Sequence, residues 1–157
     1  MKIIFLDVDG VLNDAFTKDR APGGFIGLNH SMVSQLKRII DATGAIVVLT
    51  STWKDDWDPA GHDSTPDGKY LENVLKEHGI TIADKTNDHI SNRGEGISNY
   101  LASHTDVEAW IALDDDIFAD YEKYGIMPHL IKTSFGYGGL SQAFANEAIY
   151  RLNKDAD

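Results

Sequence analysis

The sequence predicts an α/β fold of three layers, in which a doubly wound parallel sheet lies between two layers of helices. Short, continuous apolar runs alternate along the chain with segments whose apolar residues recur at helical spacing. The apolar runs contain no regular polar positions, as expected for strands that are buried on both faces. We find no internal repeat, low-complexity tract or linker, so we expect one domain over residues 1–157.

The predicted strands and helices follow one another in a regular order. The apolar, β-branched runs that we predict as strands are 2–8, 45–50, 80–83, 108–113 and 129–133. The segments that we predict as helices are 30–42, the stretch from about 70 to 78, 93–104 and 141–153. Turn formers predict a loop or small flap over 13–29 and a polar loop over 51–69.

The composition narrows the function classes. The net charge is −11 and the sequence pI is about 4.8, so the chain repels a nucleic-acid backbone overall. A local basic pocket could still bind a nucleic-acid end. The absence of cysteine excludes disulfides and thiolate metal sites. We expect a cytoplasmic protein with no membrane partner, because Asp7 interrupts the N-terminal apolar run and no stretch approaches about 18 apolar residues. We also expect a monomer.

Polar residues stand where three of the predicted strands end. The first strand ends in Asp7 and Asp9, the second in Thr50 and Ser51, and the fourth in the acidic run 114–116. The carboxyl ends of parallel strands meet at one edge of a sheet, where ligands bind. A lone acid after a strand is usually a turn former, and an acidic run is usually solvated surface. Carboxylates that converge from distant strands, however, need a cation between them, which predicts a Mg²⁺ site.

The spacing of Asp7 and Asp9 suits phosphoryl chemistry. Residues two apart on a strand point to the same face, and Gly10 permits a sharp turn directly after them. We therefore predict that Asp7 attacks phosphorus to form an aspartyl-phosphate, while Asp9 donates and accepts protons. The metal would offset the repulsion between the nucleophile and the phosphate oxygens.

Hydroxyl and basic side chains complete the predicted site. Thr50 and Ser51 are candidates to donate hydrogen bonds to a phosphate oxygen, although a threonine at a strand end also caps turns. Arg93 is predicted in the first turn of a helix N-capped by Asn92, where a phosphate gains from both the cation and the helix end. The alternative for Arg93 is an exposed ion pair, and Lys85 is then the phosphate-binding cation.

Taken in order, these motifs resemble the haloacid dehalogenase-like (HAD) phosphatase superfamily. They are DVDGVL at 7–12, a strand ending in Thr-Ser, a basic residue and a strand ending in paired aspartates. VVLTSTWK, RGEGISNYL and WIALDDD more narrowly resemble the HAD-type domain of Swiss Army Knife RNA repair proteins and its stand-alone relatives. The resemblance implies a Rossmann-like HAD core.

The resemblance also implies catalytic and metal-binding roles. Asp7 matches the nucleophile, Asp9 matches the acid/base, and Thr50 matches the hydroxyl of the second motif. The implied ligands of Mg²⁺ are Asp7, the backbone carbonyl of Asp9, and Asp115 with Asp114 beside it. The run of three acids leaves the register of the last two ligands open.

The implied substrate contacts lie around these acids. Arg93 takes the place of the third motif, where the superfamily more often has lysine, so Lys85 remains the alternative. Gly10 and Ser51 lie next to the motif residues and are predicted to contact substrate. Trp53 lies at the same edge, where it could stack on a nucleobase, although a tryptophan in a long loop more often buries that loop.

The chain has no room for a large cap domain, because only 19 residues separate Gly10 from His30 and loop 51–69 is equally short. We predict a Mg²⁺-dependent phosphomonoesterase that acts through an aspartyl-phosphate. The acidic surface favours a nucleotide or another small phosphoester as the substrate. An open site also suits polynucleotide ends, so a 3′-phosphatase of RNA or DNA repair is the alternative.

Two hypotheses of other classes share the acid cluster. A receiver-type signalling module would accept phosphate on Asp84, at the end of the third predicted strand. It requires adjacent acids on the first strand and a lysine at the end of the last, whereas Asp7 and Asp9 are separated and Lys132 stands elsewhere. A catalytically silent binding protein would keep the metal cluster without turnover, but the presence of every motif residue favours an enzyme.

Overall fold

A computed structural model describes residues 1–88 and 92–154 of the chain. Five parallel strands form one sheet in the order β3-β2-β1-β4-β5. The strands are β1 (Lys2–Leu6), β2 (Ile46–Leu49), β3 (Ile82–Lys85), β4 (Ala109–Asp114) and β5 (Leu130–Lys132). The helices are α1 (His30–Thr43), α2 (Pro66–Glu77), α3 (Arg93–Ser103) and α4 (Gln142–Asn153), with short 3₁₀ helices η1 (Thr52–Asp55) and η3 (Met127–His129).

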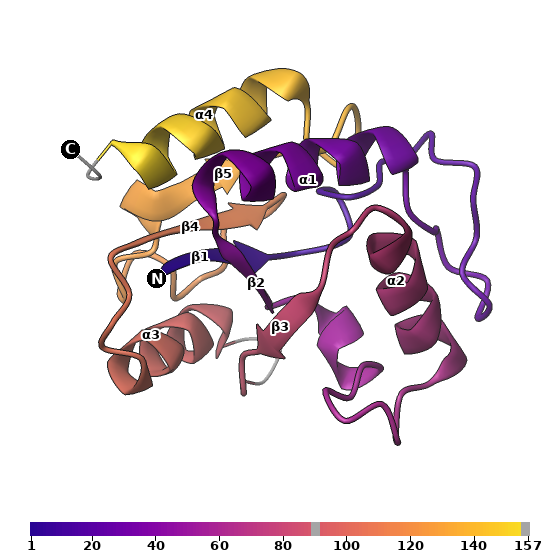
Figure 1. Cartoon of the computed structure of the whole chain (residues 1–157), viewed down its shortest axis with the longest axis horizontal. Coiled ribbons are helices and arrows are strands. Elements are labelled where there is room, and N and C mark those ends of the chain that lie inside the picture. Colours follow the sequence, from indigo (N-terminus) through magenta and orange to yellow (C-terminus); the bar gives the residue numbers. More distant parts are fainter. Residues whose placement is uncertain (89–91, 155–157) are drawn as a thin grey trace.

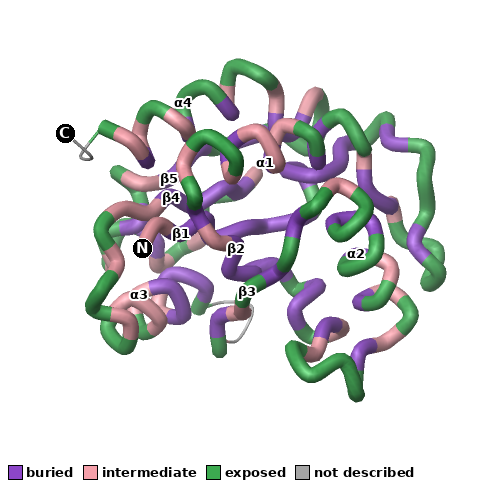
Figure 2. Tube along the Cα trace, viewed as in Figure 1, coloured by how far each residue is buried: buried purple, intermediate pink, exposed green. Residues whose placement is uncertain are grey.

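The helices cover both faces of the sheet. Helices α1 and α4 pack against each other over one face, and α3 lies on the other (Figure 1). Apolar side chains of α2 join the same core as those of α1 and α4, while α3 and the segment 118–130 enclose a second core. The strands are buried at the centre of the molecule (Figure 2). The predicted three-layer, Rossmann-like α/β fold is therefore confirmed.

Local sequence explains how α1 begins and ends. The side chain of Asn29 accepts a hydrogen bond from the amide of Met32, which satisfies one free donor of the first turn. Gly44 ends the helix with φ of 72°, a left-handed conformation that glycine adopts without strain. The buried residues Met32, Leu36 and Ile39 form the apolar stripe that faces the sheet.

Three boundaries differ from the sequence prediction. Strand β1 ends at Leu6 rather than at residue 8, because the chain turns and the amides of residues 11 and 12 donate to the carbonyl of Val8. Strand β3 starts two residues late, because the amide of Ile80 still bonds to the end of α2. Helix α2 begins within the predicted loop, at Pro66, where Thr65 caps the amide of Gly68.

The segment 13–29, which we call the flap, is tied to α2. An isolated bridge between Arg20 and Ile26 gives it a small antiparallel tip. The amide of Gly23 donates to the carboxylate of Asp67 at 2.8 Å, and the amide of Leu28 donates to the hydroxyl of Tyr70 at 3.0 Å. Neither the flap nor the segment between β2 and α2 forms a cap domain, so the predicted lack of a large cap is confirmed.

No helix within residues 1–88 and 92–154 has the length and apolar content needed to span a membrane.

Candidate active site

The strand register places one polar residue from every strand at the carboxyl edge of the sheet. Leu6 of β1 pairs with Leu49 of β2 on one side and with Leu113 of β4 on the other. Thr86, Thr50, Asp7 and Asp114 lie level with one another at this edge. On β5 the residue level with Asp114 is Lys132, and Thr133 follows it and donates its amide to the carbonyl of Asp114. Side chains that are distant in sequence therefore converge because parallel strands end together.

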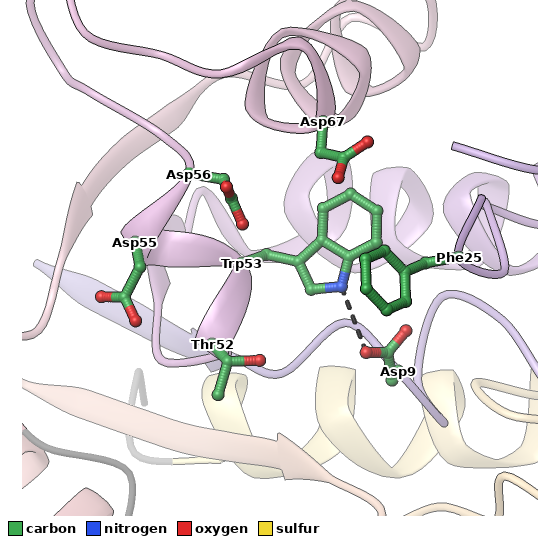
Figure 3. A pocket seen from close by; sticks show the side chains of 7 residues that line it. All are labelled: Asp9, Phe25, Thr52, Trp53, Asp55, Asp56 and Asp67. Carbon is green, nitrogen blue, oxygen red and sulfur yellow. Dashed lines mark hydrogen bonds between the residues drawn. The ribbon is translucent and has the colours of Figure 1, made fainter. Parts of the chain in front are cut away.

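A cavity of about 250 Å³ lies beside this row. Its walls come from the turn after β1, the flap, η1 and the first turn of α2 (Figure 3). The residues that line it are Asp9, Phe25, Thr52, Trp53, Asp55, Asp56 and Asp67. Asp9 thus links the cavity to the strand ends.

Three aspartates form a cluster at the end of β1 and β4. Asp7, Asp114 and Asp115 each offer a carboxylate oxygen, and these oxygens lie within 4.8 Å of one another. Asp7 and Asp114 are buried and Asp115 is half-buried. Burial, followed by the charge of Asp114, raises the pKa of Asp7 well above its ordinary value, although Arg93 opposes the shift. Burial also raises the pKa of Asp115.

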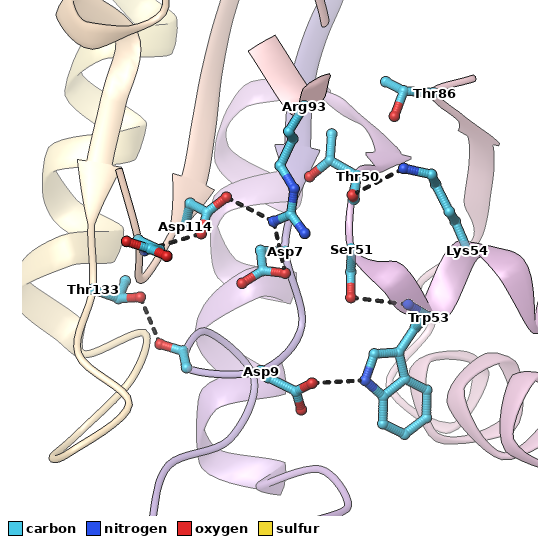
Figure 4. Close-up of polar contacts among 12 residues, drawn as sticks. Asp7, Asp9, Thr50, Ser51, Trp53, Lys54, Thr86, Arg93, Asp114 and Thr133 are labelled. Atoms are coloured by element: carbon cyan, nitrogen blue, oxygen red, sulfur yellow. Dashed lines mark hydrogen bonds and ion pairs between the residues drawn. The ribbon is translucent and has the colours of Figure 1, made fainter. Parts of the chain in front are cut away.

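Arg93 is the cation of this cluster (Figure 4). Its Nη1 lies 3.1 Å from Oδ1 of Asp7 and 2.9 Å from Oδ2 of Asp114. Burial would lower the pKa of the guanidinium, but the two carboxylates outweigh it and raise the pKa. The guanidinium also packs 4.1 Å from the ring centre of Phe118, and its Nε has no acceptor among the described residues. Arg93 is therefore buried and charged, not the exposed residue of the alternative prediction.

The three consecutive acids differ in their partners. Both oxygens of Asp114 are used: Oδ2 accepts from Arg93 and from the hydroxyl of Tyr121 at 2.7 Å, and Oδ1 accepts from the amide of Asp116 at 3.0 Å. The exposed carboxylate of Asp116 accepts from the amide of the next residue. Asp115 instead faces Asp7 and the turn after β1. Asp114 is therefore bound by the protein through both oxygens, whereas Asp115 faces Asp7 within the cluster.

The absence of a side chain at Gly10 leaves space for the carboxylate of Asp115. A Cβ atom at Gly10 would lie 2.3 Å from Oδ2 of Asp115, so any other residue would collide with that carboxylate. Gly10 has a φ of +83°, which most other residues avoid. The hydroxyl of Thr133 donates to the carbonyl of Gly10 at 2.5 Å, and the amide of Gly10 donates to Asn13 at 2.8 Å. The turn is thus fixed from two sides.

The carboxylate of Asp9 lies outside the acid cluster. Nε1 of Trp53 donates to one oxygen at 3.1 Å (Figures 3 and 4), and Nδ2 of Asn13 donates to the other at 2.9 Å. Trp53 is only 7% exposed, so it buries its loop and also orients Asp9. The two donors hold the Asp9 carboxylate at the mouth of the cavity.

The end of β2 leads directly into η1. Thr50 and Ser51 are buried, and the hydroxyl oxygen of Ser51 accepts a hydrogen bond from the amide of Trp53 at 3.2 Å, which caps η1. Lys54 turns back beneath the strand end: its ammonium lies 3.4 Å from the carbonyl of Thr50 and 3.0 Å from the buried carboxylate of Asp88. Ser51 therefore has a structural use besides the substrate contact that we predicted.

Lys85 is not brought to the acid cluster. Its ammonium donates to the carbonyls of Lys54 at 2.8 Å and Trp57 at 2.7 Å. These two carbonyls belong to the end of η1 and the residues after it, so Lys85 fastens that loop to β3. Of the two cations that we considered for phosphate, only Arg93 contacts Asp7.

The start of α3 differs from the sequence prediction. Asn92 stands at the N-cap position but makes no side-chain cap bond, so the predicted capping role of its side chain was wrong. The cap comes from Asp120, whose two oxygens accept from the amides of Gly94 at 3.0 Å and Glu95 at 2.9 Å. Because these amides are already bonded, a phosphate would gain from the Arg93 side chain and not from them.

Sequence reasoning missed several residues that hold the site together. They are Asn13, Lys54, Tyr121, Asp120 and Thr133. Asn13 follows the DVDG motif directly, so its position was a usable signal. Asp120 accepts hydrogen bonds from amides more than twenty residues earlier in the chain, and Tyr121 donates to Asp114 across a turn. These contacts become visible only when α3 packs against the 118–130 segment.

The residues fit a hard divalent cation. The cluster consists of oxygen donors, the ligands that Mg²⁺ prefers, and it is buried. Burial, followed by the negative charge of Asp114, raises the pKa of Asp7, and burial is also the main cause of the raised pKa of Asp115. A bound cation would favour the ionised form of both carboxylates.

A family model described as the HAD domain in Swiss Army Knife RNA repair proteins matches residues 3–145. The chain belongs to this family. The match covers β2 to β5, all of β1 except Lys2, and the acid cluster, so the resemblance found in the sequence motifs is confirmed. HAD membership suggests a hydrolase, and HAD enzymes generally use Mg²⁺, which agrees with the acid cluster. No curated protein and no solved structure gives a significant match to the chain.

Proposed function

We propose that this HAD domain is a Mg²⁺-dependent phosphomonoesterase that acts through an aspartyl-phosphate on Asp7. The observation that carries the proposal is the position of Asp7, which lies in a buried cluster of acids and contacts the cation Arg93. A carboxylate in this setting can approach a phosphoryl group only if positive charge offsets the repulsion. Arg93 supplies such charge from the protein, and the acid cluster can recruit more.

In the first step, an oxygen of Asp7 attacks phosphorus and the bond from phosphorus to the leaving oxygen breaks. Arg93 orients Asp7 and neutralises charge on the phosphoryl oxygens. Thr50 and Ser51 stand at the same edge and supply hydroxyl donors. Asp9 protonates the leaving alcohol, which for this reason must lie toward the cavity that Asp9 lines.

In the second step, water attacks the phosphorus of the aspartyl-phosphate. Asp9 accepts the proton of that water, the acyl-phosphate bond breaks, and Asp7 is regenerated together with inorganic phosphate. The hydrogen bonds from Trp53 and Asn13 hold Asp9 beside the reaction without giving it a charged partner. The net reaction is hydrolysis of a phosphomonoester to an alcohol and phosphate.

Asp7 and Asp115 would hold Mg²⁺, together with the backbone carbonyl of Asp9 that the family resemblance implies. The bound cation would supply positive charge next to the transferring phosphoryl group. Asp114 is the third member of the cluster and would be a further ligand, while its Oδ2 also binds Arg93 and Tyr121 and so positions the arginine.

A small phosphoester, such as a nucleotide, is the proposed substrate class. The 3′-phosphate end of RNA or DNA is the second candidate, and the RNA repair proteins that name the family favour it. The charge of the chain, −11, favours the small phosphoester. The receiver-type alternative has less support, because the carboxylate of Asp84 accepts from the hydroxyl of Tyr100 and is not part of the acid cluster.

Hydrolysis of p-nitrophenyl phosphate and a panel of nucleotides, with and without Mg²⁺, tests this proposal. We expect wild-type activity that depends on Mg²⁺ and that Asp7→Asn abolishes. RNA and DNA oligonucleotides with 3′-phosphate ends belong in the same panel. Equal turnover by the wild type and Asp7→Asn, or no turnover of any phosphoester by a folded, Mg²⁺-bound protein, would refute the proposal.

A further inference from the structure

The cavity beside Asp9 carries four carboxylates and two aromatic rings. Asp9, Asp55, Asp56 and Asp67 supply the acids, and no ion pair within the described residues neutralises any of them. The nearby lysines are used elsewhere: Lys54 pairs with Asp88, and Lys85 binds backbone carbonyls. The negative charge of the cavity is therefore uncompensated.

Uncharged hydrogen-bond donors hold the carboxylates of Asp56 and Asp67 in the cavity wall. Oδ1 of Asp56 accepts from the hydroxyl of Thr65 at 2.9 Å, and Oδ1 of Asp67 accepts from the amide of Gly23 at 2.8 Å. Each of these bonds orients a carboxylate without cancelling its charge. Asp55 lies at the exposed side of the cavity. Side chains held in this way form a negative wall before any ligand arrives.

The aromatic walls give the cavity a flat apolar part. The indole of Trp53 lies at its centre, and Phe25 reaches over from the flap (Figure 3). Phe25 is 69% exposed, and hydrogen bonds on either side of it tie the flap to α2, so its ring is accessible at a fixed position. A ring or a short aliphatic group of a ligand in the cavity would cover the exposed ring of Phe25.

We propose that this cavity is the leaving-group subsite, and that it selects small phosphomonoesters whose alcohol carries a cationic amine or guanidinium group. The inference rests on the proposed function, since it takes Asp9 as the group that protonates the leaving oxygen. That oxygen must lie next to Asp9, so the remainder of the alcohol extends into the cavity. There the alcohol packs on Trp53, while its cation faces Asp55, Asp56 and Asp67.

The same features act against a polynucleotide leaving group. A volume of about 250 Å³ is below the roughly 300–1,000 Å³ that is typical for drug-sized ligands, so the cavity accommodates one small group. Phosphodiesters next to the scissile ester would meet uncompensated carboxylates and be repelled. The subsite therefore distinguishes a small cationic alcohol from a nucleic-acid end.

Three phenyl phosphates that differ only at the end of one side chain test the subsite. They are O-phosphotyramine, which carries an ammonium group, neutral 4-ethylphenyl phosphate, and 3-(4-phosphonooxyphenyl)propanoate, which carries a carboxylate. We expect kcat/KM to be at least about tenfold higher for the ammonium ester than for the neutral ester, and lowest for the carboxylate ester. The preference should weaken as salt is added.

Two double variants identify the source of the preference. In Asp55→Asn/Asp67→Asn, the ratio of the ammonium ester to the neutral ester should fall several-fold, because asparagine keeps the shape and the acceptor for Gly23 but not the charge. The control Glu72→Gln/Glu77→Gln also removes two negative charges. Both of these residues are exposed on α2, the helix that carries Asp67, but they lie outside the cavity, so the ratio should stay unchanged. Thermal melts confirm that both variants fold.

The outcomes separate the two proposals. Hydrolysis of the neutral ester that needs Mg²⁺ and Asp7, with equal rates for all three esters, would overturn the subsite and leave the phosphatase intact. Faster hydrolysis of the carboxylate ester, or of an oligonucleotide 3′-phosphate, would also overturn it. Failure to hydrolyse any ester would refute the proposed function itself.

Discussion

At the scale of single residues, the site contains buried charged groups that stabilise one another. Each would be unfavourable in this buried position without an opposite charge beside it. Asp7 and Asp115 have raised pKa values, whereas Arg93 keeps its proton because two carboxylates contact it. Burial strengthens both effects, since few water molecules can screen the charges. Such strained electrostatics is typical of a site that is selected for function and not for stability.

The change Asp7→Asn should abolish activity and stabilise the metal-free protein. Loss of the nucleophile should reduce kcat at least about 10³-fold. At pH 7.5 the neutral amide removes a charge that burial and Asp114 disfavour, so we expect the free energy of unfolding and the Tm to rise. A calorimetric melt in EDTA measures the rise in Tm, and a variant less stable than the wild type would contradict the assignment.

The change Arg93→Met should destabilise the protein strongly. It leaves the buried Asp7 and Asp114 without their cation, and breaking such a pair costs about 3–5 kcal/mol. Arg93→Lys keeps the charge but not the planar fork, so it should cost less stability while still lowering kcat/KM. Urea unfolding at pH 7.5 compares the two variants, and equal losses would show that charge is not the dominant factor.

At the scale of helices and loops, Asp120 holds the helix start that carries Arg93. Its carboxylate caps the amides of Gly94 and Glu95, and Arg93 stands directly before them at the start of α3. These bonds fix the position of Arg93 relative to the ends of the strands. A residue after β4 thus controls a helix that precedes β4 in the chain.

The change Asp120→Ala should lower both stability and activity. Loss of a helix cap costs about 0.5–2 kcal/mol. Because the first turn of α3 carries Arg93, we also expect KM for the phosphoester to rise. Asp120→Asn retains one acceptor and is the matched control, with an intermediate effect on both quantities. Urea unfolding and steady-state kinetics provide the two measurements, and an unchanged KM in the folded alanine variant would exclude the positioning role.

The sequence predicted the strands and their polar ends better than it predicted the loops. The apolar runs of β1, β2 and β4 are long enough to identify, and parallel topology then brings Asp7, Thr50 and Asp114 together. Helix α2 was predicted to start too late because Thr65 and Pro66 are common in loops as well as at helix starts. The cap by Asp120 depends on a contact between residues more than twenty positions apart, which no local pattern encodes.

At the scale of the whole molecule, the site that we propose for a phosphoester belongs to a strongly negative chain. The net charge is −11, and the structure provides one cation, Arg93, in contact with the acid cluster among the described residues. In the proposed function, affinity for phosphate would then come mainly from Mg²⁺ and from Arg93. The orientation of Asp9 toward Trp53 is also a property of the assembled fold, because η1 and the turn after β1 meet only in three dimensions.

Stability should depend on pH and Mg²⁺ together. The pKa values of Asp7 and Asp115 are raised in the fold, so their stabilising contribution is complete below their ordinary value of 3.8 and is lost as pH rises through the raised values. Mg²⁺ competes with those protons, so it should raise Tm more at pH 7.5 than at pH 5. Asp7→Asn should reduce this pH dependence. A Mg²⁺ effect that is larger at pH 5 would contradict the assignment of the metal site.

Covalent labelling tests the central claim most directly. Wild type and Asp9→Asn are mixed with p-nitrophenyl phosphate and Mg²⁺, quenched in acid and reduced with borohydride, which converts an aspartyl-phosphate to homoserine. We predict homoserine at position 7, in greater amount in Asp9→Asn because its second step lacks the base. Asp84 serves as the internal comparison. Homoserine at position 84, or turnover with no labelled residue, would contradict the account.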